Sequence, residues 1–424
     1  MAMTPALATP GQLAAERLAL SLLAAPDIQA AMAAAREEAE TEPLLSRPRV
    51  AERLDIAIRR WVTGLILREA AGDPEAPQIL WVGETTPRTW LGHTLGGVAL
   101  AGDNPDAIYR HAFVDGGAVY EMTGRFPATP PAEFSIEPLP GEAGVIPESG
   151  TLTGKIGTSG GAPMLTDRGL RRDADGRFRI ILGGDPPADG ADHIPLPPGP
   201  VAINTRDVFS DWRQSPVPLE IRRLSPPRAP QLTDADIRAR ILAHLPAYVR
   251  HWRRFKDSWL GGVTPNTYKG PFGREGAWSQ ILAGRFSLEP GQAALFRGRA
   301  GGARYHGFHV ADHWQVGFDA ARRQCSLNAA QALPGDDGMV TYVIAPSDPG
   351  VANWIDTAGC LDGVFLMRWQ LFPPGFQAQD HVGGYELAPL AEVAARTGLP
   401  PVSPAERAAQ LQRRAAAYAV RLTT

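Results

Sequence analysis

The stretch that decides the fold runs from Arg304 to Trp369 and holds three dense phrases: RYHGFH at 304–309, CSLN at 325–328 and DPGVANWIDTAG at 348–359. Their alternation predicts short β-strands joined by tight turns, with many aromatic, His, Asp and Asn side chains. Polar and aromatic groups at strand ends and turns are how β-scaffolds form binding sites. The stretch therefore predicts an antiparallel β-domain with a site, and it does not name a reaction.

Asp-Gly pairs occur before and within this stretch and begin at Asp115, Asp175, Asp189, Asp337 and Asp362. Between alternating segments such a pair is typical of a two-residue hairpin, because a type I′ turn needs positive φ at both central residues. The pairs therefore predict antiparallel hairpins and argue against a βαβ nucleotide-binding fold. Strands are expected at 109–113, 118–123, 177–182 and 219–224.

Four segments carry helix signals. Thr9-Pro10 with Gln12 gives a cap, a proline at the first helical position and a polar third residue, and a second helix is expected from about Val50. A long helix is expected from Thr233, kinked at Pro246, and a last one from Ser403.

These elements predict an α+β protein. Two antiparallel β-sandwich or jelly-roll-like domains are expected to follow a helical N-terminus and to be joined by a bridging helix. A C-terminal helix closes the chain. The expected boundaries are a helical region at 1–78, a first sandwich at 79–225, a linker and helix at 226–261, a second sandwich at 262–375 and a helical tail at 376–424.

The composition excludes several classes of protein. The chain has 424 residues, 44% of them hydrophobic, and a net charge of −3, which gives no pull towards nucleic acid or an anionic membrane. No run approaches the about 20 apolar residues of a membrane span, and no signal peptide is recognisable. The two cysteines, Cys325 and Cys360, are expected to be buried free thiols in a cytoplasmic protein. The basic and aromatic segment 250–256 is interpreted as a solvated helix face rather than a nucleic-acid surface.

The phrases between Tyr305 and Gly359 resemble the domain of unknown function numbered twelve-fourteen. The earlier half more loosely resembles its usual partner, the domain numbered twelve-fifty-four, through Asp103-Asn104-Pro105-Asp106 with Tyr109, and through Arg206 with Phe209, Asp211 and Trp212. The resemblance implies two sandwich or jelly-roll domains joined by helices and supplies no catalytic residues. Histidine at 306, 309 and 313 departs from the expected pattern.

Those histidines raise a metal hypothesis, which the spacing does not favour. Along a strand, His309 and His313 share one side while His306 points to the other, so one strand cannot supply a three-ligand site. No metal and no organic cofactor are predicted. Ser159 lies in a Gly-x-Ser-x-Gly match, but the required strand and helix around it are missing, so a nucleophile there is not predicted.

The candidate site is a pocket in the second sandwich. Its proposed catalytic groups are His309, Asp356 and Arg304, with a His–Asp pair as general base. Its proposed ligand-binding residues are Tyr305, His313, Trp314, Asn328, Asn353, Trp354, Arg368 and Trp369. The Asp-Pro-Gly and Asn-Trp phrases are explained equally well by turn chemistry. The earlier segment 103–111 becomes part of a site only if Tyr109, Arg110 or His111 meets the second domain across a cleft.

The leading hypothesis is a small-molecule-binding protein or a cofactor-independent hydrolase, lyase or isomerase. Its ligand would be partly apolar and held in the C-terminal sandwich or between the domains. The alternative is a non-enzymatic module that assembles oligomers or binds glycans, in which the tryptophans are core or contact groups. A homo-oligomer is compatible with both.

Overall fold

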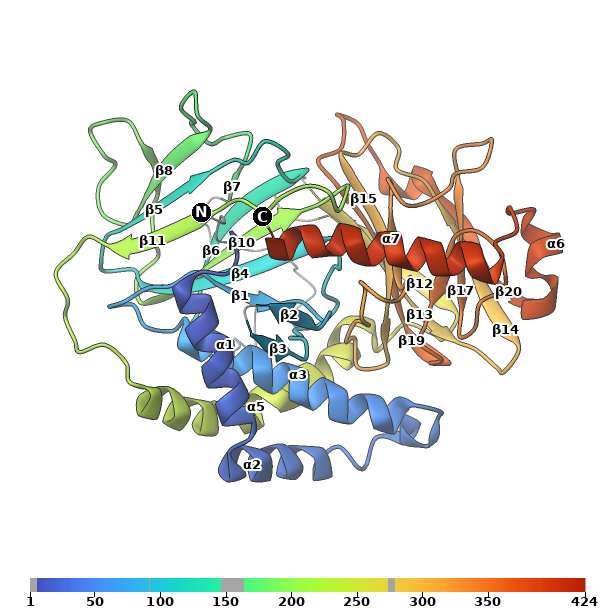
Figure 1. Cartoon of the computed structure of the whole chain (residues 1–424), viewed down its shortest axis with the longest axis horizontal. Coiled ribbons are helices and arrows are strands. Elements are labelled where there is room, and N and C mark those ends of the chain that lie inside the picture. The colour runs from blue at the N-terminus through green and yellow to red at the C-terminus, as the bar shows by residue number, and fades with distance from the viewer. Residues whose placement is uncertain (1–5, 91, 146–163, 274–278, 424) are drawn as a thin grey trace.

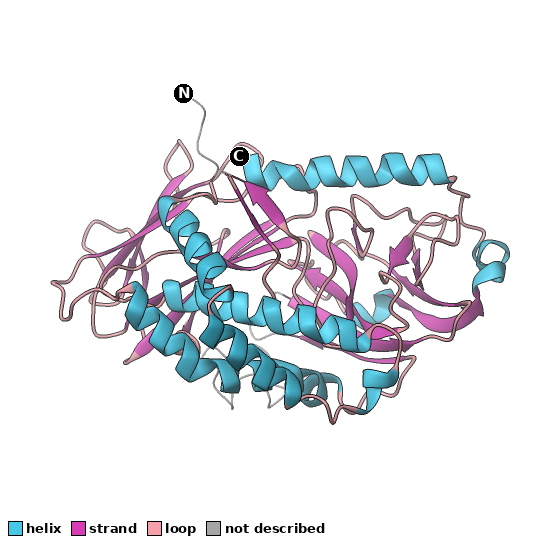
Figure 2. Ribbon diagram, turned by 60° about the horizontal axis from the view of Figure 1, so that its bottom comes forward, coloured by secondary structure: helices cyan, strands magenta, loops and turns pink. Residues whose placement is uncertain are grey.

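Two β-sandwiches lie side by side, with helices on two opposite sides of the pair (Figures 1 and 2). The computed structural model describes residues 6–90, 92–145, 164–273 and 279–423. Both sandwiches are built almost entirely from antiparallel strands. The predicted α+β fold class is therefore confirmed.

The first sandwich has a five-stranded sheet in the order β1-β4-β10-β6-β7 and a four-stranded sheet in the order β11-β5-β8-β9. Its core is aliphatic and aromatic, including Phe134, Ile180 and Ile203. A small hairpin, β2 (Arg88–Trp90) and β3 (His93–Leu95), stands beside it. The strands are β1 (Leu80–Gly83), β4 (Ala107–Asp115), β5 (Tyr120–Arg125), β6 (Glu133–Pro140), β7 (Leu165–Thr166), β8 (Arg177–Leu182), β9 (Asp192–Ile194), β10 (Pro200–Val208) and β11 (Leu219–Arg223).

The second sandwich pairs a five-stranded sheet, β12-β13-β19-β15-β16, with a four-stranded one, β18-β17-β14-β20. Stacked rings of Phe296, Phe308, Tyr342 and Phe365 fill its interior. The strands are β12 (Thr267–Gly273), β13 (Ser279–Ser287), β14 (Gln292–Gly298), β15 (Tyr305–Asp312), β16 (Ser326–Asn328), β17 (Val340–Ala345), β18 (Trp354–Asp356), β19 (Asp362–Gln370) and β20 (Val382–Pro389). Because β20 pairs with β14 along its length, the predicted end of this sandwich at 375 is wrong.

The Asp-Gly pairs do not form the predicted hairpins. The strands that flank Asp115 and those that flank Asp337 belong to different sheets, and the strands around Asp189 pair in parallel. Asp362 and its glycine lie inside β19. Most connections between consecutive strands, such as those from β4 to β5 and from β16 to β17, cross from one sheet of a sandwich to the other. The Asp-Gly pairs therefore predicted the antiparallel architecture correctly, but the hairpins expected at the pairs themselves are wrong.

The predicted helix starts are confirmed. Thr9 caps α1 by accepting from the backbone N–H of Gln12, and Thr233 and Asp236 form a reciprocal capping box. Ser403 and Glu406 form another at the last helix. The helices are α1 (Pro10–Leu23), α2 (Pro26–Glu37), α3 (Val50–Ala70), α5 (Asp234–Leu260), α6 (Val393–Thr397) and α7 (Pro404–Thr423). Within the described residues no single helix is long and apolar enough to span a membrane; α1 and α2 reach that composition only as a pair bent by 71°.

Helix α7 runs along the side opposite α1, α2, α3 and α5 and joins the two sandwiches (Figures 1 and 2). Three buried arginines, each seven residues from the next, fix it. Arg407 binds Asp348 and the carbonyl of Val351, and Arg414 binds Ser326, all in the second sandwich. Arg421 reaches the first sandwich through Glu84 and the carbonyl of Pro105.

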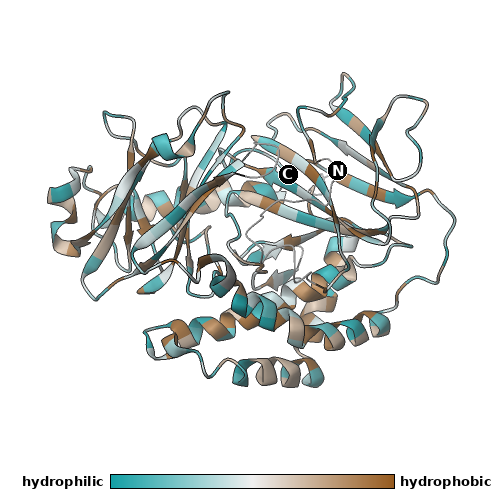
Figure 3. Cartoon of the chain, turned by 180° about the vertical axis from the view of Figure 1, so that it is seen from behind, coloured by the Kyte–Doolittle hydropathy of each residue, from teal (hydrophilic) through white to brown (hydrophobic). Residues whose placement is uncertain are grey.

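Hydrophobic and hydrophilic residues alternate along the strands (Figure 3), and because side chains alternate faces this gives each five-stranded sheet an outer face. In β4 and β10, Ala112 and Ile203 point into the sandwich core while His111 and Asn204 point away from it. In β19, Phe365 and Met367 are core residues while Leu366 and Arg368 face outwards. The C-terminal half of α5 packs on this second outer face through Trp259 and Leu260.

Candidate functional site

A cavity of about 300 Å³ lies between the outer faces of the two five-stranded sheets and helix α5. This interdomain pocket is at the small end of the range of ligand sites, which are concave and mostly apolar. Both sandwiches and the loop from Leu100 to Asn104 line it. Each domain supplies part of the wall, so the pocket exists only when both domains are present.

The first sandwich supplies a polar wall. Tyr109 and His111 project from β4, Arg206 and Asn204 from β10, and Glu137 from β6. Their alternation and register place them on one face, because His111 pairs with Asn204 and Asn204 with Glu137. Arg206 donates to Glu137 at 2.9 Å, so these two charges balance each other.

The second sandwich and α5 supply the opposite wall. Arg368 and Gln370 extend from β19. Trp252, Phe255 and Trp259 recur at helical spacing on one face of α5, with ring centroids 5.4 Å and 6.1 Å apart. The pocket therefore combines an aromatic ladder with a few polar groups.

Four buried polar atoms on these walls have no hydrogen-bond partner within the described residues. Three lie on strands, Asn204 Oδ1, Arg368 Nε and Gln370 Oε1, and the fourth is the indole Nε1 of Trp252 on α5. Arg368 does anchor its other end, donating from Nη2 to the Gly102 carbonyl at 2.8 Å. A buried polar atom left unpaired costs about 1–3 kcal/mol, so four that converge on one cavity need an explanation.

Asp103 is the titratable group of the pocket. Its Oδ2 accepts from the Leu100 N–H at 2.8 Å. Burial raises the pKa of Asp103 to about 7, with a further increase from Glu84 that the Leu100 bond and the positive charges of Arg368 and Arg60 oppose. His111 behaves in the opposite way: burial and the charges of Arg68 and Arg206 hold its pKa well below the ordinary range. Near neutral pH the pocket therefore offers Asp103 as a proton-transfer group and also contains the neutral imidazole of His111.

Replacing Asp103 with asparagine should remove a pH dependence of stability. A folded pKa of about 7, above the ordinary 3.8, means that the folded state binds the proton more tightly than the unfolded state. The stability that Asp103 contributes is full below about pH 4 and is lost as the pH rises to about 7. Urea denaturation from pH 4 to 8 should show wild type losing stability relative to Asp103→Asn across this window.

Asp337→Asn is the matched control, since Asp337 is exposed and its pKa is lowered by the Met339 N–H and by Arg297. Its contribution is present above pH 3.8 and should stay constant over the same range. Parallel curves for wild type and Asp103→Asn would contradict the assignment.

Beside the pocket, a buried polar junction joins the two domains. Tyr305 of β15 donates to Asp106 at 2.9 Å and receives a bond from the Asn104 amide at 2.7 Å. Asn328 of β16 and the Trp212 indole also donate to Asp106, at 3.0 Å and 2.6 Å. A side chain on Gly307 would collide with the Tyr305 hydroxyl and the Asp106 carboxylate, which explains glycine in mid-strand. Tyr305 and Asn328, predicted to bind ligand, thus lie in this junction.

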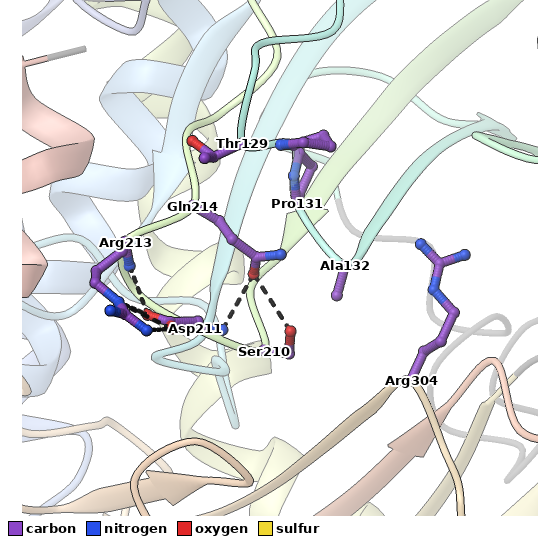
Figure 4. A pocket seen from close by; sticks show the side chains of 9 residues that line it. Thr129, Pro131, Ala132, Ser210, Asp211, Arg213, Gln214 and Arg304 are labelled. Carbon is purple, nitrogen blue, oxygen red and sulfur yellow. Dashed lines mark hydrogen bonds and ion pairs between the residues drawn. The ribbon is translucent and has the colours of Figure 1, made fainter.

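Arg304 lies elsewhere, on an open pocket of about 740 Å³ (Figure 4). Figure 4 shows it across from Asp211 and Arg213, which bind each other, and it is 3.6 Å from Asp167. His313 lines a third, smaller cavity of about 80 Å³ beside Lys256 and Asp362. Neither residue meets His309, so the predicted catalytic cluster is not assembled.

The three tryptophans do not wall a common pocket. Trp314, Trp354 and Trp369 belong to three different hydrophobic clusters. Each indole N–H donates to a backbone carbonyl, of Val50, Ala345 and Arg299 respectively. This corrects the expectation of an aromatic-walled site inside the second sandwich, whose interior is filled by stacked rings.

His309 and Asp356 are not joined by a hydrogen bond. Asp356 accepts from Arg323 at 2.9 Å and from the Ala358 N–H at 2.7 Å, as turn chemistry predicts. The ring of His309 is buried, and burial with the charge of Arg368 holds its pKa well below the ordinary range. Asn353 exchanges two bonds with the backbone of Leu333.

No group of three His, Cys, Asp or Glu side chains suited to a metal ion occurs in the part of the chain that the structure describes. Cys325 and Cys360 are buried free thiols. Ser159 lies outside the described residues.

Of the predicted site residues, only Arg368 lines the interdomain pocket. The condition set for segment 103–111 is met, because Tyr109 and His111 face Arg368 and Gln370 across the cavity. Arg110 is instead buried beneath, paired with Asp207 at 2.5 Å. Asn204, Glu137 and Gln370 were missed. Their only signal was a polar residue on an outer sheet face, which sequence assigns to solvent by default.

One comparison with solved structures agrees with the fold. No protein-family model and no curated protein matches the chain. A crystal structure of an uncharacterised protein from Burkholderia cenocepacia is similar over 88% of this chain and 99% of that chain, with a TM-score of 0.66 and 20% identity. The VPA0106 protein from Vibrio parahaemolyticus covers 68% of this chain and 89% of its own, with a TM-score of 0.40 and 10% identity. The first similarity supports the shared fold of the two sandwiches and says nothing of a ligand.

Proposed function

We propose that this protein binds a small, partly apolar molecule in the interdomain pocket. The observation that carries the proposal is the convergence of three buried, unpaired polar atoms, on Asn204, Arg368 and Gln370, on one cavity with an aromatic wall. A ligand that supplied their partners would recover the desolvation cost of each. Few polar groups set in apolar walls is the arrangement of ligand sites in general.

The reaction class that suits the pocket is proton transfer by Asp103. A carboxyl group whose pKa lies near neutrality can act as both general acid and general base. Hydrolysis, elimination or isomerisation needs such a group and no organic cofactor. We therefore propose Asp103, in place of His309 and Asp356, as the proton-transfer residue of any reaction here.

We also keep the resemblance to the paired domains numbered twelve-fifty-four and twelve-fourteen as a proposal. It is supported by where its phrases lie. The Asn-Pro-Asp phrase of the first half and the Tyr305 and Asn328 phrases of the second half meet at one buried junction. A pairing of domains that share such a junction would explain why both phrases occur in one chain.

Filling the pocket tests the binding proposal. Asn204→Trp places a large ring in the cavity from the central strand β10. A library of neutral and charged fragments is screened against wild type by saturation-transfer NMR. Fragments that bind wild type should bind this variant at least about tenfold more weakly, because the cavity they need is occupied.

Glu220→Trp is the matched control, since Glu220 is exposed on the edge strand β11 and the same ring there should leave binding unchanged. If no fragment discriminates between wild type and Asn204→Trp, the pocket is not a ligand site. The reading as a non-enzymatic assembly or glycan-binding module is then favoured.

A further inference from the structure

We infer that the ligand of the interdomain pocket is a small ring-bearing carboxylate with a hydroxyl or N–H donor. This inference rests on the proposed binding function and specifies its substrate class. It is built from the charge balance of the pocket, the unpaired atoms on its walls and the position of the aromatic ladder.

Among the described residues that line the pocket, the charge balance leaves Arg368 as a cation without an ion-pair partner. Arg206 is paired with Glu137, and both lie on the first wall. Arg368 has no carboxylate within ion-pair distance among the described residues, and its Nε is buried without an acceptor. The charge of Arg368 acts on the carboxyl group of Asp103, which burial keeps in part protonated at neutral pH. A monoanion is the ligand that would neutralise this site.

The shape of the Arg368 guanidinium narrows the class of anion that the pocket can bind. Arg368 is held at one end by the Gly102 carbonyl, so its planar fork is fixed in orientation. A fixed guanidinium edge matches the two oxygens of a carboxylate, and such charge-assisted bonds are roughly twice as strong as neutral ones. A single fork in a cavity of about 300 Å³ suits a carboxylate better than a bulkier, doubly charged phosphate.

The two other unpaired atoms on strands need donors. Asn204 Oδ1 and Gln370 Oε1 are both acceptors, and they extend from opposite walls, while the unpaired Trp252 indole on α5 is a donor. A carboxylate oxygen cannot satisfy either acceptor, whereas each hydroxyl or N–H group on the same ligand can satisfy one of them. Gln370 lies two residues from Arg368 on the same face of β19, so the donor and the carboxylate must be separated along the ligand.

The body of the ligand lies against α5. Trp252, Phe255 and Trp259 line one side of the cavity, with Ile281 from β13. Aromatic pairs gain about 0.5–1.5 kcal/mol beyond the area that they bury. A ring-bearing body is therefore preferred over a flexible chain of equal size.

The test uses three probes with one shared ring: 4-hydroxyphenylacetate, its methyl ester and phenylacetate. Isothermal titration calorimetry measures each against the full chain. We expect the hydroxy acid to bind at least about tenfold more tightly than the ester, and several-fold more tightly than phenylacetate. Arg368→Gln should abolish the preference for acid over ester, and Arg368→Lys should retain part of it because the charge stays and the fork is lost.

Arg304→Gln is the matched control, an arginine on the open pocket of Figure 4, and it should leave all three affinities unchanged. If Arg368→Gln loses its fold, Asn204→Leu provides a second route: it should remove the advantage of the hydroxyl and keep that of the carboxylate. Equal binding of acid and ester to wild type overturns this inference and leaves the pocket as a ligand site. Failure of all three probes, together with a fragment screen in which Asn204→Trp makes no difference, overturns the proposed function as well.

Discussion

Glu16→Ala is expected to lower the free energy of unfolding by about 3–5 kcal/mol, the cost of leaving a buried charge without its partner. Glu16, in α1, is fully buried and lies 2.6 Å from Arg88 of β2. It also accepts from the Trp90 indole at 2.8 Å and from Gln12 at 2.9 Å, and contacts His93 at 2.6 Å. Burial alone would raise the pKa of Glu16, but Arg88 and these bonds lower it. Urea denaturation followed by tryptophan fluorescence measures the loss.

Asp55→Ala is the control that isolates the effect of burial on the cost of losing an ion pair. Asp55 pairs with Arg36 at 2.8 Å but is 65% exposed, so its loss should cost no more than about 1 kcal/mol. Replacing Glu16 and Arg88 together by methionine should cost less than Glu16→Ala alone, since no uncompensated charge remains. An equal loss of unfolding free energy in Glu16→Ala and Asp55→Ala would show that the buried network stabilises the fold no more than an exposed ion pair does.

Asp106→Leu should cost about 3 kcal/mol or more and should also loosen the two domains from each other. It removes the acceptor of three buried donors, on Trp212, Tyr305 and Asn328, and two of these belong to the second sandwich. Thermal unfolding followed by calorimetry should change from one transition towards two, because the junction that couples the sandwiches is broken.

The control for Asp106→Leu is Asp337→Leu. Asp337 is 57% exposed and binds Arg297 within the second sandwich, so its loss should shift stability by no more than about 1 kcal/mol and leave the number of transitions unchanged. A single transition in Asp106→Leu at nearly the wild-type temperature would show that the junction is not a coupling element.

Sequence predicted what depends on local patterns. The capped helices begin at Pro10, Asp234 and Pro404, as the signals at Thr9, Thr233 and Ser403 required. The alternating strands were found, but not their partners. Asp115 and its glycine look like a hairpin turn, yet the chain there leaves one sheet for the other. Which sheet a strand joins depends on packing between distant segments, and a dipeptide carries no information on it.

The candidate site shows the same limit. His309, Asp356 and Trp354 stood out because catalytic residue types gathered within one stretch of chain. The side chains of Asp356 and Trp354 are instead used by the backbone and the core of that stretch. The pocket is made of residues such as Asn204 and Gln370, which are 166 positions apart and ordinary in their own neighbourhoods. They come to line one cavity only because the outer faces of the two sheets pack against each other.

The spacing of the arginines on α7 fixes the distance between their binding partners in the two sandwiches, in addition to joining the sandwiches. Seven residues rise about 10 Å along a helix and return to nearly the same face, so Arg407, Arg414 and Arg421 measure equal steps from one sandwich to the other. Removing one residue between Arg414 and Arg421 would turn the last arginine by about 100°, away from Glu84 and Pro105. The exposed face of α7 is free to change its residues, but the helix is not free to change its length.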